Sequence, residues 1–275
     1  MGAGAGGGAG RGGLALALAA AAAVAVAVAA VAAAVLGPAA LRRPGAAARG
    51  VAAAGLAAAG LTCALAAWRA RGRRRRAGRA SGRRGPVRAL AVLGSGGHTA
   101  EMLHVLKHLP ASRYAPVTYV TASTDVSSDS KARALEAERE AGAGVGGGSG
   151  GAGASASFRT IPRSREVGQS FLTSVGTTLH ASLFAFAVVW QERPELVLTN
   201  GPGTCIPICA AFWLLRAWGM CPNGPLIYVE SIARVTRLSL SAKILYHSRI
   251  ADELFVQWEG LQRRYPRSTF SGRLM

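Results

Sequence analysis

The chain has 275 residues, 50% of them hydrophobic, and 32 Lys and Arg against 13 Asp and Glu give it a formal net charge of +19. The length allows one large domain or two small ones with a buried core, and the positive mean hydropathy excludes an intrinsically disordered chain. All the acidic residues follow Arg88, whereas 14 Arg lie within residues 1–88, so the excess charge is local and excludes an evenly basic nucleic-acid-binding protein.

The N-terminal residues are typical of a membrane anchor. Residues 1–13 form a low-complexity Gly/Ala start with too few side chains to build a core. Residues 14–36 contain no charged or polar side chain, and about 20 apolar residues suffice for a helix to cross the ~30 Å hydrocarbon layer. A second apolar run covers residues 51–68. We therefore predict an anchor over residues 14–68, with either one or two transmembrane helices.

A basic collar, residues 69–86, follows this anchor and contains nine Arg. The positive-inside rule places such a collar on the cytosolic side, so the rest of the chain is expected to face the cytosol. The Arg side chains would also attract anionic membrane lipid. Two alternatives stay open, namely an unstructured Ala/Gly/Arg extension and a cleaved targeting sequence.

From Val87 onward, short apolar runs alternate with helix-like segments. Strands are predicted at residues 87–93, 117–121, 158–161, 196–199, 226–229 and 254–256. Helices are predicted at residues 99–109, 127–140, 170–192, 205–218 and 239–248. Such alternation indicates βαβ units, so residues 87–275 are predicted to be one α/β domain with a Rossmann-like, mostly parallel sheet. Residues 141–157, rich in Gly, Ala and Ser, are predicted to be a flexible insertion in this domain.

The loop after the first strand is a candidate anion site. It consists of Gly94, Ser95, Gly96, Gly97, His98 and Thr99. Ligands of parallel sheets bind beyond the carboxyl ends of the strands, and a glycine-rich turn before a helix brings N–H groups close to a phosphate. The loop lacks the Lys-Ser/Thr pair of a P-loop and has Thr99 where a dinucleotide fingerprint has its third Gly, but Asp125 keeps an NAD site among the alternatives. His98 is a candidate base, with a structural role as the alternative.

Three further segments follow strands at the same edge of the predicted sheet. They are Asn200-Gly201-Pro202-Gly203-Thr204 after the fourth strand, Glu230-Ser231 after the fifth, and Arg163 and Arg165 after the third. The glycine turn would expose backbone amides, the carboxylate would bind sugar hydroxyls or act as a base, and the arginines would add positive charge. Each segment has a structural alternative: an ordinary strand-to-helix turn, a helix cap and a solvated loop.

Other chemistries are not indicated. Cys63, Cys205, Cys209 and Cys221 form no CxxC pair, so a reducing compartment is expected, and no cluster of His, Cys, Asp and Glu has metal-ligand spacing. No predicted strand ends in the G-x-S-x-G elbow of a Ser-His-Asp hydrolase. We therefore expect neither a metal nor a cofactor.

Several motifs, taken in chain order, resemble one known family. They are Gly94-Ser-Gly-Gly-His-Thr99, Ile161-Pro-Arg-Ser-Arg-Glu-Val167, Thr177-Thr-Leu-His180, Asn200-Gly-Pro-Gly-Thr-Cys-Ile-Pro-Ile-Cys209, Tyr228-Val-Glu-Ser-Ile232, and Val256-Gln-Trp258 with Arg264-Tyr-Pro266. This set closely resembles the membrane-anchoring subunit of the two-subunit UDP-N-acetylglucosamine transferase that adds the second GlcNAc to the dolichol-linked oligosaccharide. The resemblance covers residues 88–275.

This resemblance implies a split GT-B glycosyltransferase, with this chain as the acceptor-side half, similar to the N-terminal half of the bacterial enzyme MurG. The donor half would be a separate soluble catalytic subunit that binds UDP-GlcNAc. This chain would recruit that subunit to the cytosolic face of the endoplasmic reticulum and help to bind dolichyl-diphosphate-GlcNAc, giving dolichyl-diphosphate-chitobiose. By similarity, residues 94–99 would contact the acceptor diphosphate, His98 would be the candidate general base, and residues 200–204 and Glu230 would line the cleft. No metal or cofactor is implied.

The C-terminal residues are predicted to contact the partner subunit. The candidates are Trp258, Phe270, Leu274 and Met275, and a frayed terminus is the alternative.

Two other functions of the protein stay open. One is a self-sufficient membrane glycosyltransferase, which is disfavoured because too few residues follow Val256 for a second nucleotide-binding domain. The other is an NAD(P)-binding oxidoreductase.

Overall fold

The computed structural model describes residues 85–144, 156–164, 171–201 and 203–274. The predicted low-complexity start, anchor and most of the collar lie outside the described residues, as do Arg165, Pro202 and Met275. The strands are β1 (Ala89–Val92), β2 (Val117–Ala122), β3 (Ser157–Ile161), β4 (Leu196–Asn200), β5 (Leu226–Val229) and β6 (Glu253–Phe255). The helices are α3 (Gly97–Lys107), α4 (Val126–Gly144), α5 (Phe171–Glu192), α6 (Cys205–Ala217), α7 (Leu240–Ser248) and α8 (Glu259–Arg264).

The six strands form one sheet in the order β3-β2-β1-β4-β5-β6, and every neighbouring pair is parallel. This confirms the predicted parallel α/β architecture. Ala89 of β1 lies opposite Val117 of β2 on one side and Leu196 of β4 on the other. The strand order therefore reverses between β1 and β4. In doubly wound sheets such a reversal opens a crevice at the carboxyl ends of the two strands, where ligands bind.

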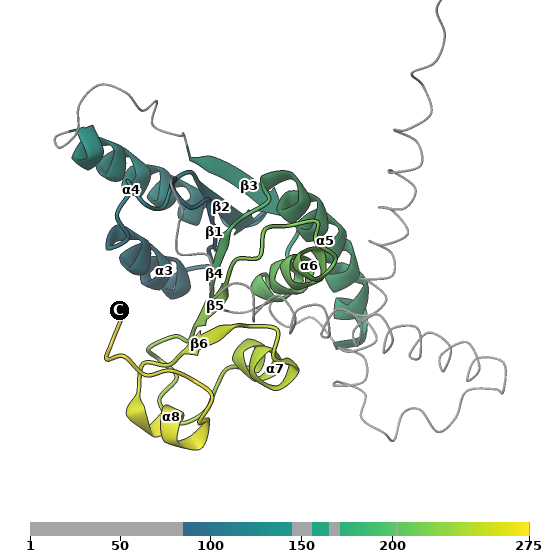
Figure 1. Cartoon of the computed structure of the whole chain (residues 1–275). Helices are drawn as coiled ribbons and strands as arrows, with labels where there is room; N and C mark the ends of the chain where they lie inside the picture. The colour runs from purple at the N-terminus through teal and green to yellow at the C-terminus, as the bar shows by residue number, and fades with distance from the viewer. Residues whose placement is uncertain (1–84, 145–155, 165–170, 202, 275) are drawn as a thin grey trace, which may run out of the picture.

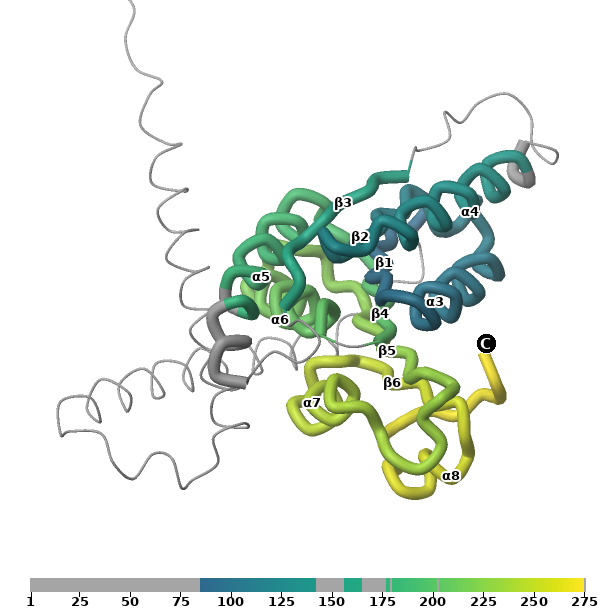
Figure 2. Tube along the Cα trace, turned by 180° about the vertical axis from the view of Figure 1, so that it is seen from behind, coloured from purple at the N-terminus to yellow at the C-terminus, as the bar shows by residue number. Residues whose placement is uncertain are grey.

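Helices cover both faces of the sheet (Figure 1), with α3 and α4 on one face and α5 and α6 on the other. Successive side chains of a strand point to opposite faces, so Ala91 packs with α3 and α4, whereas Leu90 and Val92 pack with α5 and α6. All four residues of β1 are buried, which explains why the strand is a continuous apolar run. The rear view shows the same layers, with α7 and α8 beyond β5 and β6 (Figure 2).

The structure differs from several of the predicted boundaries. α3 begins at Gly97, two residues earlier than predicted, so the second half of the glycine-rich loop is helical. α4 continues to Gly144 and β3 begins at Ser157, so both ends of the predicted insertion belong to regular elements, while residues 145–155 lie outside the described residues. α8 was not predicted, because six residues are too few to establish a 3.6-residue period.

The residues after α8 pack along the edge of β6. The Val256 N–H donates to the Thr269 carbonyl oxygen at 2.9 Å, and the Thr269 N–H donates to the Leu254 carbonyl oxygen at 2.8 Å. Further on, the Leu274 N–H donates to Gln257 Oε1 at 2.8 Å. The described part of the C-terminal tail is therefore held by the sheet rather than frayed.

α5 is a long helix that packs against the core. Its 22 residues place Ala185 and Val189 in the core, while Leu183 and Phe184 are exposed. Among the described residues, no helix combines the length and the hydrophobicity needed to cross a membrane. The predicted anchor, residues 14–68, lies outside this part of the chain and stays a prediction.

Candidate functional site

The candidate site lies where the strand order reverses, between β1 and β4. Residues 94–96 lead from β1 into α3, and residues 201–204 lead from β4 into α6. His98 stands in the first turn of α3, and its Nδ1 lies 3.0 Å from Oδ1 of Asn200, the last residue of β4. The fold thus brings together two candidate residues that are 102 positions apart in the sequence.

Two glycines make room for the His98 ring. A Cβ atom at Gly94 would lie 2.7 Å from His98 Cβ, and a Cβ atom at Gly201 would lie 2.9 Å from His98 Cγ. Gly201 also has a φ of +90°, a left-handed conformation that other residues rarely adopt. Any larger residue at either position would displace the ring. These two glycines, which were predicted to bind a ligand, also make room for the histidine.

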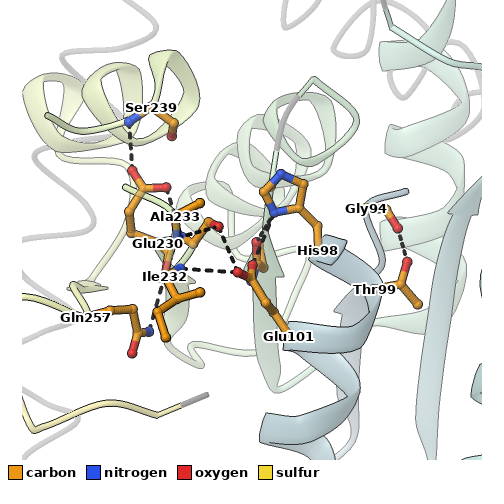
Figure 3. A network of polar contacts seen from close by, with 12 residues as sticks. Gly94, His98, Thr99, Glu101, Glu230, Ile232, Ala233, Ser239 and Gln257 are labelled. Atoms are coloured by element: carbon orange, nitrogen blue, oxygen red, sulfur yellow. Dashed lines mark hydrogen bonds and ion pairs between the residues drawn. The ribbon is translucent and has the colours of Figure 1, made fainter. Parts of the chain in front are cut away.

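Glu101, one turn further along α3, contacts residues at the carboxyl ends of three strands (Figure 3). Its Oε2 lies 3.2 Å from His98 Nδ1 and accepts a hydrogen bond from Asn200 Nδ2 at 2.9 Å. Its Oε1 accepts hydrogen bonds from Ser231 Oγ at 2.7 Å and from the Ile232 N–H at 3.2 Å. These partners lie just after β1, at the last residue of β4 and just after β5, so a single carboxylate connects the ends of three strands.

The surroundings of Glu101 favour its ionised form. Burial raises the pKa of this carboxyl group, but hydrogen bonds from Ser231, Asn200 and His98 and the attraction to His98 outweigh burial, so the pKa is lowered overall. An ionised carboxylate has acceptor oxygens only, which matches the N–H and O–H donors that face it. The network therefore depends on a carboxylate at this position.

The hydrogen-bond partners assign the ring proton of His98. Nδ1 faces two acceptors, the Glu101 carboxylate and Asn200 Oδ1, so Nδ1 carries a hydrogen. In the neutral ring, Nε2 is then an acceptor. Figure 3 shows this second nitrogen pointing away from the network, and the side chain is 31% exposed. The site thus offers a nitrogen that can take a proton from a ligand.

Ser95, Gly96 and Gly97 form the open side of the first loop, and all three are exposed. Gly96 precedes α3 with a φ of +64°, and no side chain caps this end of the helix. A Cβ atom at Gly96 or Gly97 would meet no atom within 4 Å. The first N–H groups of a helix have no partner within it, and with no side chain in front of them they suit an anionic oxygen.

Thr99 and Asp125 serve the fold. Thr99 Oγ1 donates to the Gly94 carbonyl oxygen and is fully buried. The Asp125 carboxylate accepts the Ser128 Oγ hydrogen at 2.6 Å and the Ser128 N–H at 3.2 Å, so it caps the start of α4, and only 8% of the residue is exposed. A carboxylate engaged in this way is poorly placed to bind the ribose of a dinucleotide, which disfavours the NAD alternative.

The second glycine turn is supported from below by β5 and α6. The Gly201 carbonyl oxygen accepts hydrogen bonds from Tyr228 Oη at 3.4 Å and from Cys205 Sγ at 3.1 Å. Gly203 has a φ of +47° and is partly exposed, whereas Thr204 is buried at the start of α6. Gly201 is therefore held on its inner side, and Gly203 is accessible.

Glu230 is buried and holds a loop closed. Only 1% of the residue is exposed, and its two carboxylate oxygens accept the Ser231 N–H at 3.0 Å and the Ser239 N–H at 2.8 Å. Burial raises the pKa of Glu230, although hydrogen bonds from Ser239 and Ser231 oppose this effect. The capping alternative thus describes Glu230 better than the predicted contact with a sugar. Ser231 reaches the site only through its bond to Glu101.

The remaining candidates belong to other segments of the described structure. Arg163 is partly exposed and follows β3, which β2 separates from β1, and Arg165 lies outside the described residues. Trp258 Nε1 donates to the Ile232 carbonyl oxygen at 2.8 Å, and the Arg273 guanidinium lies 4.4 Å from the centre of the Trp258 ring. The predicted partner-facing residues Trp258 and Phe270 are partly buried against the core.

No metal site is visible in the described part of the chain, where no three His, Cys, Asp or Glu side chains are grouped around a common point. Cys205, Cys209 and Cys221 are free thiols in the core. Burial raises the pKa of Cys221 to about 11, so this thiol stays protonated at neutral pH.

Comparison with known proteins identifies the family. The family described as "Oligosaccharide biosynthesis protein Alg14 like" matches residues 89–274. The chain belongs to the Alg14 family. It is 45% identical to the "UDP-N-acetylglucosamine transferase subunit ALG14" of Rattus norvegicus and 41% identical to that of Homo sapiens, each over 186 residues that cover 68% of this chain and 82% of the relative. A crystal structure of Acinetobacter baumannii MurG aligns with 68% of this chain and 45% of its own, at 16% identity and a TM-score of 0.42.

Glu101 is a residue of this Alg14-family site that no sequence motif indicated. Glu101 lies three positions after His98 on a predicted helix, and side chains at that spacing share one face. That spacing alone was a usable signal for the His98 contact. The bonds to Asn200 and Ser231 had no such signal, because they depend on the order of the strands in the sheet.

Proposed function

We propose that this Alg14-family chain is the membrane-anchored, acceptor-side subunit of a UDP-N-acetylglucosamine transferase. It would recruit a separate soluble catalytic subunit, which binds UDP-GlcNAc, to the cytosolic face of the endoplasmic reticulum. There the complex would convert dolichyl-diphosphate-GlcNAc to dolichyl-diphosphate-chitobiose during assembly of the N-linked glycan precursor. The rat and human relatives support this role, because their names call them subunits of a UDP-N-acetylglucosamine transferase.

The convergence of His98, Glu101 and Asn200 at the ends of β1 and β4 carries this proposal. A chain that served as an anchor alone would not need an ordered polar network in the crevice of its sheet. An acceptor with a diphosphate and a sugar hydroxyl needs an anion site and a group that accepts a proton. The exposed start of α3 and the free Nε2 of His98 meet these two needs within one loop.

The proposed reaction makes one bond and breaks one. The hydroxyl oxygen of the acceptor GlcNAc bonds to C1 of the donor sugar, and the bond from C1 to the UDP oxygen breaks with its electron pair leaving on UDP. The hydroxyl proton passes to His98 Nε2. The N–H groups at the start of α3 would hold diphosphate oxygens of the acceptor, with the accessible backbone at Gly203 facing the same crevice.

Attachment to the membrane is part of the proposal and depends on residues before the described structure. Residues 14–68 are long and apolar enough for one or two spans. The collar at residues 69–86 favours a cytosolic position for the α/β domain and would bind anionic membrane lipid. Protease protection of an epitope at the N-terminus in sealed microsomes distinguishes one span from two.

We further propose that the C-terminal residues contact the soluble subunit. Trp258, Phe270 and Leu274 are only partly buried, although the backbone around them is held against β6. Deletion of residues 271–275, which removes Leu274 and Met275, is expected to abolish co-purification of the soluble subunit and leave the chain in the membrane fraction. Unchanged co-purification would contradict this interface.

Reconstitution tests the proposed function. The full-length chain is purified from membranes alone and with the soluble protein that co-purifies with it, and each sample receives UDP-GlcNAc and dolichyl-diphosphate-GlcNAc. We expect chitobiose product from the complex and none from the chain alone. Product from the chain alone would favour a self-sufficient glycosyltransferase. Absence of product from the complex, together with binding of a nicotinamide cofactor, would favour an oxidoreductase.

A further inference from the structure

We infer that Glu101 is a positioning residue that fixes the proton of His98 on Nδ1 and so keeps Nε2 free to accept the acceptor's hydroxyl proton. The inference rests on the proposed function, since it assigns a role within the same site. Glu101 lies outside the sequence motifs, and its role follows from the contacts of both of its carboxylate oxygens.

Glu101 Oε2 faces His98 and Asn200. Two nitrogens point at this oxygen: His98 Nδ1 at 3.2 Å and Asn200 Nδ2 at 2.9 Å. The bond from Asn200 Nδ2 also orients the amide, so that Oδ1 turns to His98 Nδ1 at 3.0 Å. Glu101 therefore acts on the histidine twice, once directly and once by setting the orientation of Asn200. Both effects place a proton on Nδ1.

The other carboxylate oxygen of Glu101, Oε1, contacts Ser231 and Ile232 instead of the histidine. It is held by the Ser231 hydroxyl at 2.7 Å and the Ile232 N–H at 3.2 Å, both from the loop after β5. A backbone N–H cannot change from donor to acceptor, so this oxygen cannot be replaced by an NH₂ group without losing a bond. The carboxylate is thus fixed at one end by the main chain, and its other end presents a fixed acceptor to His98.

Replacing the Glu101 carboxylate with an amide would change the proton position on His98. In Glu101→Gln one of the two terminal atoms becomes an NH₂ donor. Because the Ile232 N–H requires the oxygen, the NH₂ group turns to His98 and favours the tautomer with its proton on Nε2. That tautomer cannot accept the hydroxyl proton. In a Ser-His-Asp triad, an acid-to-amide change that reverses the histidine tautomer costs about 10⁴-fold in kcat.

The test uses the complex of full-length chain and soluble subunit, assayed with UDP-GlcNAc and dolichyl-diphosphate-GlcNAc. For Glu101→Gln we expect kcat to fall by roughly 100-fold or more, with the KM for UDP-GlcNAc and the yield of complex unchanged. The matched control is Glu138→Gln, which removes the same charge from an exposed pair with Lys107 on the helical surface and is expected to leave kcat unchanged. The double variant Glu101→Gln with His98→Gln should be no slower than His98→Gln alone, because both changes remove the same proton acceptor.

Two results would overturn the inference. One is a Glu101→Gln complex with wild-type kcat, and the other is a double variant whose losses multiply. If Glu101→Gln does not fold, Glu101→Asp keeps the charge but withdraws the carboxylate by one methylene, and wild-type kcat in that variant would also overturn it. An inactive wild-type complex would instead contradict the proposed function, so the two failures are distinguishable.

Discussion

Glu101 and Glu230 both accept a hydrogen bond from Ser231, but from different groups of that residue. Glu101 accepts the Ser231 hydroxyl and also contacts the side chains of His98 and Asn200. Glu230 accepts the backbone N–H groups of Ser231 and Ser239 and is almost completely buried. Glu101 thus organises side chains around the partly exposed His98, whereas Glu230 organises buried main chain.

The pKa shifts of the two groups follow from this difference. Burial raises the pKa of Glu230, because the hydrogen bonds it accepts do not offset the loss of water. Burial acts on Glu101 as well, but hydrogen bonds from Ser231, Asn200 and His98 lower its pKa overall. An acidic residue at a strand end is thus insufficient evidence for a site. The identity of its donors and its contact with an exposed partner distinguish the two roles.

Filling the space beside His98, with Glu230 left intact, is expected to have a large effect on kcat. In Gly201→Ala the new Cβ would lie 2.9 Å from His98 Cγ at a φ of +90°, so the ring must move out of the Glu101 network. We expect kcat of the complex to fall by roughly 100-fold, because the displaced ring no longer accepts the proton. Gly85→Ala is the control, since its Cβ meets no atom within 4 Å. Equal kcat for both variants would contradict the placement of His98.

The next effect concerns stability and should appear at Glu230. Glu230→Ala leaves the Ser231 and Ser239 N–H groups without their acceptor. We expect the free energy of unfolding of the full-length chain in detergent to fall by about 2–3 kcal/mol, measured by urea denaturation. Glu138→Ala, at an exposed side chain, should change it by less than about 0.5 kcal/mol. If Glu230→Ala lowers the free energy of unfolding by less than the control does, Glu230 does not hold the loop of residues 231–239.

The smallest effect is a difference in pH dependence. Because folding lowers the pKa of Glu101, its stabilising contribution is present above the ordinary carboxyl pKa and is lost as the pH falls through the folded-state value. Because folding raises the pKa of Glu230, its contribution is largest below the ordinary carboxyl pKa and declines as the pH rises through the folded-state value. Denaturation measured as a function of pH gives the loss in free energy of unfolding for Glu101→Gln and for Glu230→Gln relative to the wild-type chain. We expect these two losses to change with pH in opposite directions. Parallel pH profiles would contradict the comparison.

Local patterns in the sequence predicted most of this fold. The apolar run of β1, the helical period of α3 and the glycine-rich turns after β1 and β4 were sufficient to expect His98 and Asn200 at one edge of a parallel sheet. The rest required three-dimensional information. Whether Glu230 faces the crevice or the core depends on the path of residues 231–239, and the contacts of Glu101 depend on β5 lying beside β4. Neither is encoded in a motif.

We propose that the α/β domain of this chain contributes chemistry to the transferase, in addition to the predicted membrane anchor. The most direct test is the kcat of the complex assembled with His98→Gln, compared with the wild-type complex at saturating UDP-GlcNAc and dolichyl-diphosphate-GlcNAc. We expect a loss of roughly 100-fold or more with an unchanged yield of complex, because the proposed proton acceptor, Nε2 of His98, would be missing. A complex that forms normally and turns over at the wild-type rate would contradict it.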